Sequence, residues 1–303
     1  MSYPQSQQRV AITGASGLIG SALSAFLSAR GDDVVHLVRR EPRARCEIGW
    51  DPASRTLDSA HLSGVTAVVH LAGAGVGEHR WTPAYKQEIL ASRVNGTATI
   101  ATALAELGEP IALVSGSAIG AYGDRGEEML TEDSDTGKGF LADVVRDWEA
   151  ATLPAQRAGL RVVHARTGLV LTADGGAMQR ILPLARLGLA GPLGTGRQYW
   201  SWITLHDELR ALAHLIDQDI VGPVNLVSTQ PLRQAEVMKA LGAQLRRPAV
   251  MPVPALALKV ALGEFASDIL ASARILPSVL TASGFVFEHD TIESAMRWLG
   301  DAL

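Results

Sequence analysis

The sequence predicts an α/β protein, with a doubly wound parallel sheet and a smaller, mostly helical C-terminal cap domain. Short apolar runs of strand length alternate with longer segments of helical spacing over the first 170 residues. A glycine-rich turn follows the first run, and glycines interrupt the pattern repeatedly after Leu171. We therefore expect residues 1–170 to form the sheet domain and residues 171–303 to form the cap.

The first strand and helix are placed by apolar spacing and by the glycines at their ends. Residues 9–13 are largely apolar and meet Gly14, as expected for a buried strand that ends in a tight turn. Residues 18–30 carry apolar side chains at helical spacing, and Gly31 provides the stop. The later elements repeat this alternation, which predicts right-handed crossovers. The further predicted strands are residues 34–38, 66–71, 111–115 and 160–166, and the further predicted helices are residues 83–107 and 140–157.

The regular alternation of strands and helices ends in the C-terminal part, where glycines separate short segments of helical spacing. Residues 201–205 and 224–227 have the composition of strands, so we expect the segment from about 201 to 228 to rejoin the main sheet. The tail from residue 229 is expected to be mostly helical. Its predicted helices are residues 234–245, 256–262 and 291–299.

Composition excludes several classes of function. The net charge is −4 and the positive charges are scattered, so no nucleic-acid partner is expected. Cys46 is the only cysteine, which excludes a disulfide framework and suits a reducing compartment. His206 and His214 form no helical ligand pair, so no metal site is expected. Residues 1–8 lack the apolar core of a signal peptide, and residues 251–262 are too short to span a bilayer, which predicts a cytoplasmic protein without a membrane partner.

The segment T-G-A-S-G-L-I-G at 13–20 follows a predicted strand and opens a predicted helix, the context of a dinucleotide-binding Rossmann turn. Gly14 permits the turn, Gly17 lets the backbone approach a pyrophosphate, and Gly20 lets helix and strand pack closely. The helix N-terminus supplies N–H groups to the phosphates. The alternative is a glycine-rich turn without a ligand. The predicted cofactor-binding residues are Thr13, Gly14, Ser16, Gly17, Leu18, Ile19, Gly20, Arg39, Arg40, Leu71, Ala72, Gly73 and Ser115.

The end of the second predicted strand indicates which dinucleotide is bound. NAD sites usually present a carboxylate there, but this chain has Arg39 and Arg40, with Glu41 only after them. A guanidinium can hold a 2′-phosphate bidentately, so the predicted cofactor is NADP(H). The alternative is that the arginines form only a solvated basic turn.

These motifs resemble the extended and atypical short-chain dehydrogenase/reductase superfamily, within its NAD-dependent epimerase/dehydratase-like group. Further segments are similar to an epimerase-like branch of uncertain function with a distinctive C-terminal domain. The superfamily motifs are T-G-A-S-G-L-I-G at 13–20, H-L-A-G at 70–73, N-G-T at 95–97, S-G-S at 115–117, Y-G at 122–123, T-E-D-S at 131–134 and V-N-L at 224–226. The branch motifs are W-D-P at 50–52, the segment 115–120, W-E at 148–149, the segment 194–202, R-P-A at 247–249 and G-E at 263–264.

The resemblance implies a catalytic Tyr followed four residues later by Lys, and this pair is missing. None of the four tyrosines has a lysine at that offset. Phe140 falls where the Tyr would be and Val144 where the Lys would be, and neither can exchange a proton. Ser117 fits the Ser/Thr position that orients a substrate oxygen. Tyr122 is the other candidate catalytic residue, although its hydroxyl could instead serve only a loop backbone group.

The substrate side is predicted from a polar and aromatic cluster. The resemblance implies that Arg197, Tyr199 and Trp200 line the substrate pocket, where Arg197 would suit an anionic group such as phosphate. Alternatively, the tryptophans form an interface between cap and sheet. The resemblance also implies a homodimer as one possible assembly.

Two functions fit these residues. The first is an NADP(H)-dependent oxidoreductase or epimerase-type enzyme acting on a small polar substrate, for which a nucleotide-linked compound is one candidate. The second is a non-catalytic NADPH-binding sensor or regulatory protein, whose small-molecule ligand is an effector. The intact glycine motif supports both. The enzyme is the leading hypothesis, and the second function explains the missing Tyr and Lys directly. A third possibility is a scaffold with a vestigial site, which requires that no dinucleotide binds.

Overall fold

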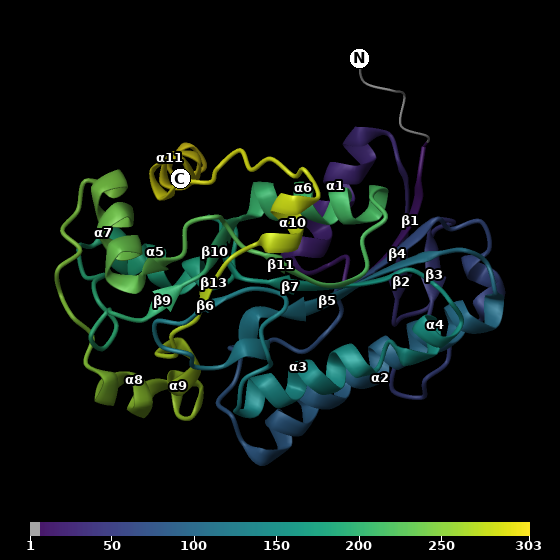
Figure 1. Cartoon of the computed structure of the whole chain (residues 1–303), viewed down its shortest axis with the longest axis horizontal. Coiled ribbons are helices and arrows are strands. Elements are labelled where there is room, and N and C mark those ends of the chain that lie inside the picture. The colour runs from purple at the N-terminus through teal and green to yellow at the C-terminus, as the bar shows by residue number, and fades with distance from the viewer. Residues whose placement is uncertain (1–6) are drawn as a thin grey trace.

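The computed structural model describes residues 7–303, which form a seven-stranded parallel sheet covered by helices on both faces (Figure 1). All six strand pairings in this sheet are parallel. The strand order is β11 (Gly222–Leu226), β7 (Val162–Thr167), β5 (Ala112–Ala118), β4 (Ala67–His70), β1 (Arg9–Thr13), β2 (Asp33–Val38) and β3 (Glu47–Gly49). The order reverses direction between β1 and β4, which is where doubly wound sheets bind their ligands. The predicted fold class is confirmed.

Two apolar layers hold helices against the sheet. On one face, α1 (Leu18–Arg30) and α6 (Leu205–Asp217) lie side by side over a buried cluster that includes Leu23 and Leu212 (Figure 1). On the other face, a second cluster includes Ile100 and Leu104 of the longest helix. The helices of that face are α2 (Pro83–Leu107), α3 (Phe140–Ala150) and α4 (Leu153–Arg157). Burial on both faces explains why the strands read as nearly continuous apolar runs.

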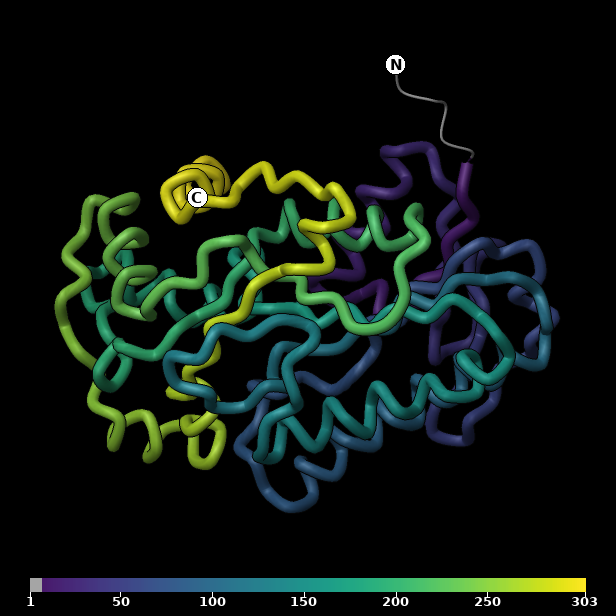
Figure 2. Tube along the Cα trace, viewed as in Figure 1, coloured from purple at the N-terminus to yellow at the C-terminus, as the bar shows by residue number. Residues whose placement is uncertain are grey.

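The cap has its own core around Trp202, which is completely buried. In Figure 2 the last part of the chain crosses the body of the molecule before it returns to the cap. The longer cap helices are α5 (Met178–Arg186), α7 (Gln234–Leu245), α8 (Ala255–Leu262) and α11 (Ile292–Asp301). Two shorter helices of the tail are α9 (Phe265–Ile269) and α10 (Ser278–Ala282). The sheet domain contains two short 3-10 helices, η1 (Ser59–Leu62) and η2 (Ile119–Tyr122). The expectation of a mostly helical tail is confirmed.

Three two-stranded sheets lie outside the large sheet. The pairs are β8 (Leu169–Leu171) with β10 (Trp202–Thr204), β9 (Tyr199–Trp200) with β12 (Leu232–Arg233), and β6 (Met129–Leu130) with β13 (Arg274–Ile275). Two of them, β8 with β10 and β6 with β13, join the sheet domain to the C-terminal region. The predicted strand at 224–227 does join the large sheet, as β11 at its edge. The predicted strand at 201–205 does not, because β10 pairs with β8 instead.

Two further predictions differ from the structure. The single helix predicted over 140–157 is wrong, because the chain breaks between α3 and α4. There the Thr152 hydroxyl bonds back to the carbonyl of Glu149, and Pro154 lacks the N–H that a continuous helix needs. The edge strand β3 was not predicted, since three residues are too short to show a periodicity.

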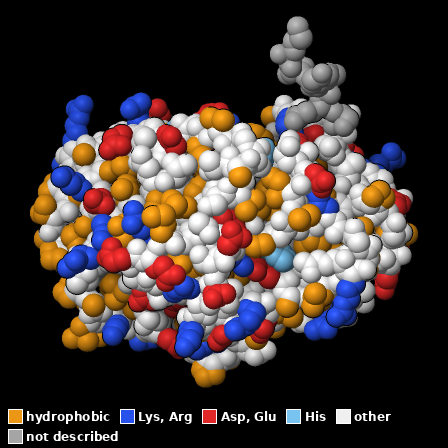
Figure 3. Space-filling view, viewed as in Figure 1, with side chains coloured by type: hydrophobic (Ala, Val, Ile, Leu, Met, Phe, Trp, Pro, Cys, Tyr) orange, Lys and Arg blue, Asp and Glu red, His pale blue; other side chains and the backbone are white. Residues whose placement is uncertain are grey.

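On the face drawn in Figure 3, Lys and Arg side chains are interspersed with Asp and Glu side chains. Within residues 7–303, no helix combines the length and the hydropathy that crossing a bilayer requires.

Candidate functional site

The glycine-rich turn connects β1 to α1 and is too tightly packed to accept side chains. Gly14 has a φ of +69°, and a Cβ at Gly20 would lie 2.2 Å from the carbonyl oxygen of Gly14. Gly17 caps α1 without a side-chain bond, and the first turn of α1 carries no acidic residue. The Gly17 N–H donates to the Gly14 carbonyl at 2.9 Å, and the first helical bond runs from Ser21 N to Gly17 O, so the N–H groups of residues 18–20 lie outside the helical pattern. This geometry fits an anionic pyrophosphate.

Other predicted members of the turn differ in exposure. Ser16 and Gly17 are exposed, whereas Leu18 and Ile19 are half-buried and pack against the core. The two apolar residues can therefore contact a dinucleotide through their backbone, while their side chains anchor the helix.

Thr13, the last residue of β1 before the glycine-rich turn, is bonded to the end of β4 and to the loop that follows it. Its side chain is completely buried, and its hydroxyl oxygen accepts the N–H groups of Leu71 at 3.0 Å and Ala72 at 3.2 Å. The same hydroxyl lies 2.7 Å from His70 Nδ1, and we assign its hydrogen to this contact because the oxygen already accepts two donors. Burial, followed by the nearby charge of Arg93, lowers the pKa of His70 to about 4. Thr13 therefore positions the 71–73 loop, and its side chain faces the protein rather than a ligand.

The two arginines after β2 have different surroundings. Arg40 donates to both carboxylate oxygens of Glu47, at 2.8 and 2.5 Å. The Arg40 hydrogen bond is the main reason that the pKa of Glu47 falls to about 2. Arg39 is exposed and has no hydrogen bond or ion pair within the described part of the chain. Of the two predicted residues, Arg39 is thus the one free to receive a phosphate, and the side chain of Arg40 is already engaged.

At the end of β5, Ser117 belongs to a buried polar group. Its hydroxyl donates to Glu149 Oε1 at 2.6 Å. Arg166, the register partner of Ser117 on β7, binds both oxygens of Glu149 at 2.8 Å. Burial favours the neutral form of Glu149, but the hydrogen bonds and charge of Arg166 outweigh it and lower the pKa of this carboxyl. Glu149 is therefore ionised and fixes the direction of the Ser117 hydroxyl. Ser115 is completely buried, which leaves only its backbone for a cofactor.

Glu149 and Arg166 were not predicted as site residues. An arginine within a buried strand requires a carboxylate partner, and this was the available signal. The partner itself lies on another element and could not be read from spacing.

Tyr122 does not have the surroundings expected of a catalytic residue. Its side chain is completely buried, and its hydroxyl donates to Asn225 Oδ1 at 2.8 Å. The same oxygen accepts Arg166 Nη1 at 3.0 Å. Burial raises the pKa of Tyr122. Since its hydroxyl both donates and accepts within the protein, the surroundings of Tyr122 fit a structural role better than the predicted catalytic one.

Phe140 and Val144, at the two positions where the resemblance implies Tyr and Lys, lie on the first turns of α3. Phe140 packs against Trp81 with ring centroids 4.9 Å apart, and Lys86 Nζ lies 4.5 Å from the Phe140 ring centroid. Val144 is buried in the same apolar cluster. Proton exchange at these positions is excluded by the side chains themselves.

The predicted substrate residues lie in the cap. The Tyr199 ring has the guanidinium carbon of Arg233 4.0 Å and that of Arg274 5.2 Å from its centroid. Arg233 is paired with both oxygens of Glu127, whereas Arg197 is exposed. The Arg274 Nε atom is buried without a hydrogen-bond partner. Glu127 and Glu236 both lie close to Arg233, so the three guanidinium groups outnumber the nearby carboxylates and favour an anion.

Trp200 and Trp202 contribute to packing. Trp202 is completely buried in the cap core, and Trp200 is half-buried against it. Both tryptophans therefore pack within the cap core.

Sequence comparisons identify the relatives of this chain. A family model described as the NAD dependent epimerase/dehydratase family matches residues 10–226, and a domain of unknown function, DUF1731, matches residues 253–299. The epimerase family protein Mb2239 of Mycobacterium bovis is 44% identical over 291 residues, covering 95% of this chain and 96% of that protein. A chloroplastic homolog of the epimerase family protein SDR39U1 from Arabidopsis thaliana is 35% identical, covering 98% of this chain and 88% of that protein.

Solved structures give the same relationship. The human epimerase family protein SDR39U1 (isoform 2), solved with NADPH, superposes with a TM-score of 0.90 at 30% identity, covering 98% of this chain and 100% of that one. The nucleoside-diphosphate sugar epimerase from Corynebacterium glutamicum superposes with a TM-score of 0.80 at 37% identity, covering 98% of this chain and 59% of that one.

Proposed function

Because this chain belongs to the NAD dependent epimerase/dehydratase family, as the resemblance of its motifs implied, we propose that it binds NADP(H) and acts as an oxidoreductase or epimerase-type enzyme. Its substrate in this proposal is a small polar molecule with an anionic group, for which a nucleotide-linked compound is one candidate. A homodimer remains a prediction.

The proposal that the protein binds NADP(H) is based on the glycine-rich turn and on Arg39. The backbone at Gly14 and Gly20 leaves no room for a Cβ, as a turn that receives a pyrophosphate requires. The Arg39 guanidinium is exposed and uncommitted at the end of β2, where a 2′-phosphate would lie. A related human protein has been solved with NADPH, which agrees with this assignment. When bound, NADP(H) would supply the hydride acceptor or donor.

The single observation that favours an enzyme is the fixed hydroxyl of Ser117. Since Ser117 donates to ionised Glu149, its oxygen keeps lone pairs that can accept a hydrogen bond from a substrate hydroxyl. Ser117 then orients the substrate, and Glu149 and Arg166 are positioning residues. Proton transfer falls to water or to a group of the substrate, because Phe140 and Val144 cannot perform it.

The substrate part rests on the cluster around Tyr199. Arg197 and Arg274 are available to an anion, and the Tyr199 ring supports the guanidinium groups that pack on it. We propose that this cluster binds the anionic end of the substrate.

The second candidate, a non-catalytic NADPH-binding sensor, is favoured by one observation. Apolar side chains occupy both positions at which the resemblance implies the acid–base pair. A protein of this kind would bind NADPH and change its contacts with an effector or partner, without transferring hydride.

One series of measurements separates these functions. The pure protein is titrated with NADPH and with NADH. Protein loaded with NADPH, and protein loaded with NADP⁺, is then incubated with nucleotide sugars and with fractionated metabolite extracts, while cofactor absorbance and the stereochemistry of the recovered sugars are followed. Turnover, measured as a change in the redox state of the cofactor or as epimerised substrate, supports the enzyme if Ser117→Ala reduces it at least tenfold and Ser21→Ala leaves it unchanged. Tight NADPH binding with neither change in any fraction supports the sensor. Failure to bind either cofactor rejects both.

A further inference from the structure

The segment at 283–289 is bound along one face of α6. His206, Arg210 and His214 follow one another at intervals of four residues, so their side chains share this face. His214 Nε2 contacts Ser283 Oγ at 2.8 Å, and Arg210 Nη1 donates to the carbonyl of Val286 at 2.8 Å. The C-terminal tail is thus held against the sheet domain by polar contacts.

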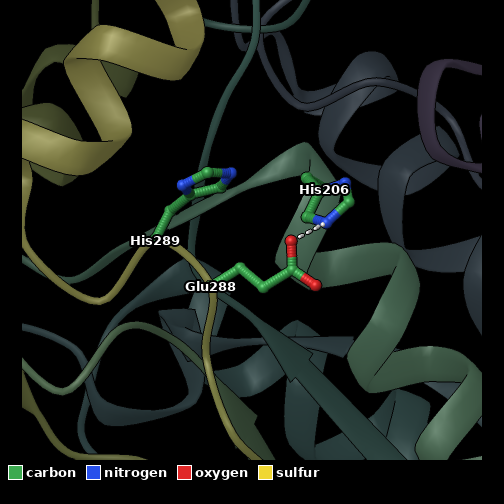
Figure 4. A group of neighbouring side chains, drawn as sticks. All are labelled: His206, Glu288 and His289. Carbon is green, nitrogen blue, oxygen red and sulfur yellow. Dashed lines mark hydrogen bonds and ion pairs between the residues drawn. The ribbon is translucent and has the colours of Figure 1, made fainter.

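A further contact between α6 and the tail brings three potential metal ligands together. His206 Nε2 lies 2.8 Å from Glu288 Oε2, and His289 is the next residue of the tail. One ligand atom from each of the three residues lies within 4.8 Å of the other two. In Figure 4, the Glu288 carboxylate lies beside the His206 ring and a dashed line joins the two, with His206 at the start of α6 and the other two side chains on the tail.

A buried carboxylate fixes the backbone that carries these ligands. Asp207 is completely buried and accepts the N–H groups of Glu288 at 3.0 Å and His289 at 2.8 Å. Asp207 follows His206 directly, so one turn of α6 positions all three side chains. The Trp298 ring packs beside His289, with the two ring centroids 5.7 Å apart. Such support from neighbouring residues is what orients ligands in metal sites.

The local charge is suited to a cation. Asp207 and Glu288 are negative, and Arg210 is the positive group that contacts both, at 2.8 and 3.2 Å. Arg210 meets the Oε1 atom of Glu288 and leaves Oε2 facing His206. Two carboxylates against one guanidinium leave a net negative charge beside two imidazole rings.

We propose that His206, Glu288 and His289 bind a divalent transition-metal ion of the zinc class. Two imidazoles and one carboxylate form a ligand set that zinc uses, with water in the fourth position. The ion would replace the hydrogen that joins His206 to Glu288. Tetrahedral ligands at zinc distances lie about 3.3 Å apart, which rotations of these partly exposed side chains can reach. The bound ion links the C-terminal tail to α6.

Sequence spacing could not reveal this cluster. The prediction of no metal considered His206 with His214, whereas the proposed site joins His206 to Glu288, 82 positions further along the chain, and to the next residue, His289. Folding, rather than a local motif, brings them together.

The test uses tag-free protein freed of metal with a chelator and titrated with Zn²⁺ in competition with a chromophoric chelator. We expect one Zn²⁺ per chain and a Zn²⁺-dependent rise in the melting temperature. His289→Ala and Glu288→Gln should each weaken binding at least tenfold and remove most of that rise. Glu288→Gln keeps an oxygen that can accept from His206, so its metal-free fold is expected to survive.

His61→Ala is the matched control, since it removes an exposed histidine remote from α6 and should leave Zn²⁺ affinity unchanged. Absence of saturable binding up to about 100 µM, a weak affinity on the scale of structural zinc sites, would overturn the proposal. Binding that both Glu288→Gln and His289→Ala leave unchanged would overturn it equally, because the ion would then lie elsewhere.

Discussion

Ser117 and Glu149 lie 32 residues apart and are joined by a 2.6 Å hydrogen bond between β5 and α3. Arg166 on β7 completes this link by binding both oxygens of Glu149. The three residues connect two neighbouring strands of the sheet to the helix that covers them. The same contacts that hold the Ser117 hydroxyl in one direction therefore also stabilise the fold.

Glu149→Ala is expected to lower the free energy of unfolding by about 3–5 kcal/mol, because it leaves the buried Arg166 guanidinium without a counter-charge. Urea denaturation measures this loss. The control is Asp143→Ala in the same helix, which removes an exposed ion pair with Arg146 and should cost about 0.5 kcal/mol or less. Similar losses in the two variants would show that the Glu149 pair contributes no more than a surface contact.

Arg39→Gln is expected to reduce the preference for NADPH over NADH about ten- to a hundredfold. This corresponds to the loss of a charge-assisted hydrogen bond of about 1.5–3 kcal/mol. Arg40→Gln removes the same charge one residue away, but this side chain is already paired with Glu47, so the preference should change little. Equilibrium titration of each variant with both cofactors measures the ratio. Equal effects of the two substitutions would mean that the phosphate responds only to the general basic charge of the turn.

Gly20→Ala is expected to weaken NADPH binding at least about tenfold and to destabilise the protein by about 1–3 kcal/mol. The new Cβ would lie 2.2 Å from the backbone oxygen of Gly14, so either the turn or α1 must move. Ser21→Ala, an exposed change in the next residue of the helix, should alter stability by about 0.5 kcal/mol or less. Unchanged binding by Gly20→Ala would show that the turn does not contact the cofactor.

The sequence predicted correctly those helices whose ends are marked by capping residues, proline or glycine. The helix Pro83–Leu107 was predicted with the bounds observed, since Pro83 follows an N-capping Thr82 and Gly108 ends it with a positive φ. The break before α4 was missed although Pro154 is a local signal against a continuous helix. The contacts of Thr152, which also mark the break, depend on the fold.

The candidate site was predictable where one segment makes it and not where several elements meet. The glycine turn and Arg39 each belong to one stretch of chain. Arg233 reaches Tyr199 because β9 and β12 pair in antiparallel fashion, a register that no spacing shows. The separate environments of Arg39 and Arg40 also depend on β3, the strand that was not predicted.

Glu208 on α6 is completely buried, and its only hydrogen bond within the described chain comes from the Thr167 hydroxyl at 2.8 Å. Its Oε2 atom has no partner. Burial raises the pKa of this carboxyl to about 8 from an ordinary value of 4.5. The folded protein therefore holds Glu208 neutral at pH values where the unfolded chain ionises it.

The contribution of Glu208 to stability should consequently fall between about pH 4.5 and 8, because the folded state binds a proton there that the unfolded state has released. Glu208→Gln cannot ionise and keeps an acceptor for Thr167, so its stability relative to the natural protein should improve by about 1–3 kcal/mol from pH 5 to pH 8. His70, with its lowered pKa, contributes the opposite slope below its ordinary value, but it does so in both proteins and cancels. Urea denaturation at several pH values measures the difference. The exposed Glu293→Gln is the control, and a pH-independent difference for Glu208→Gln would show that Glu208 is ionised in the folded state.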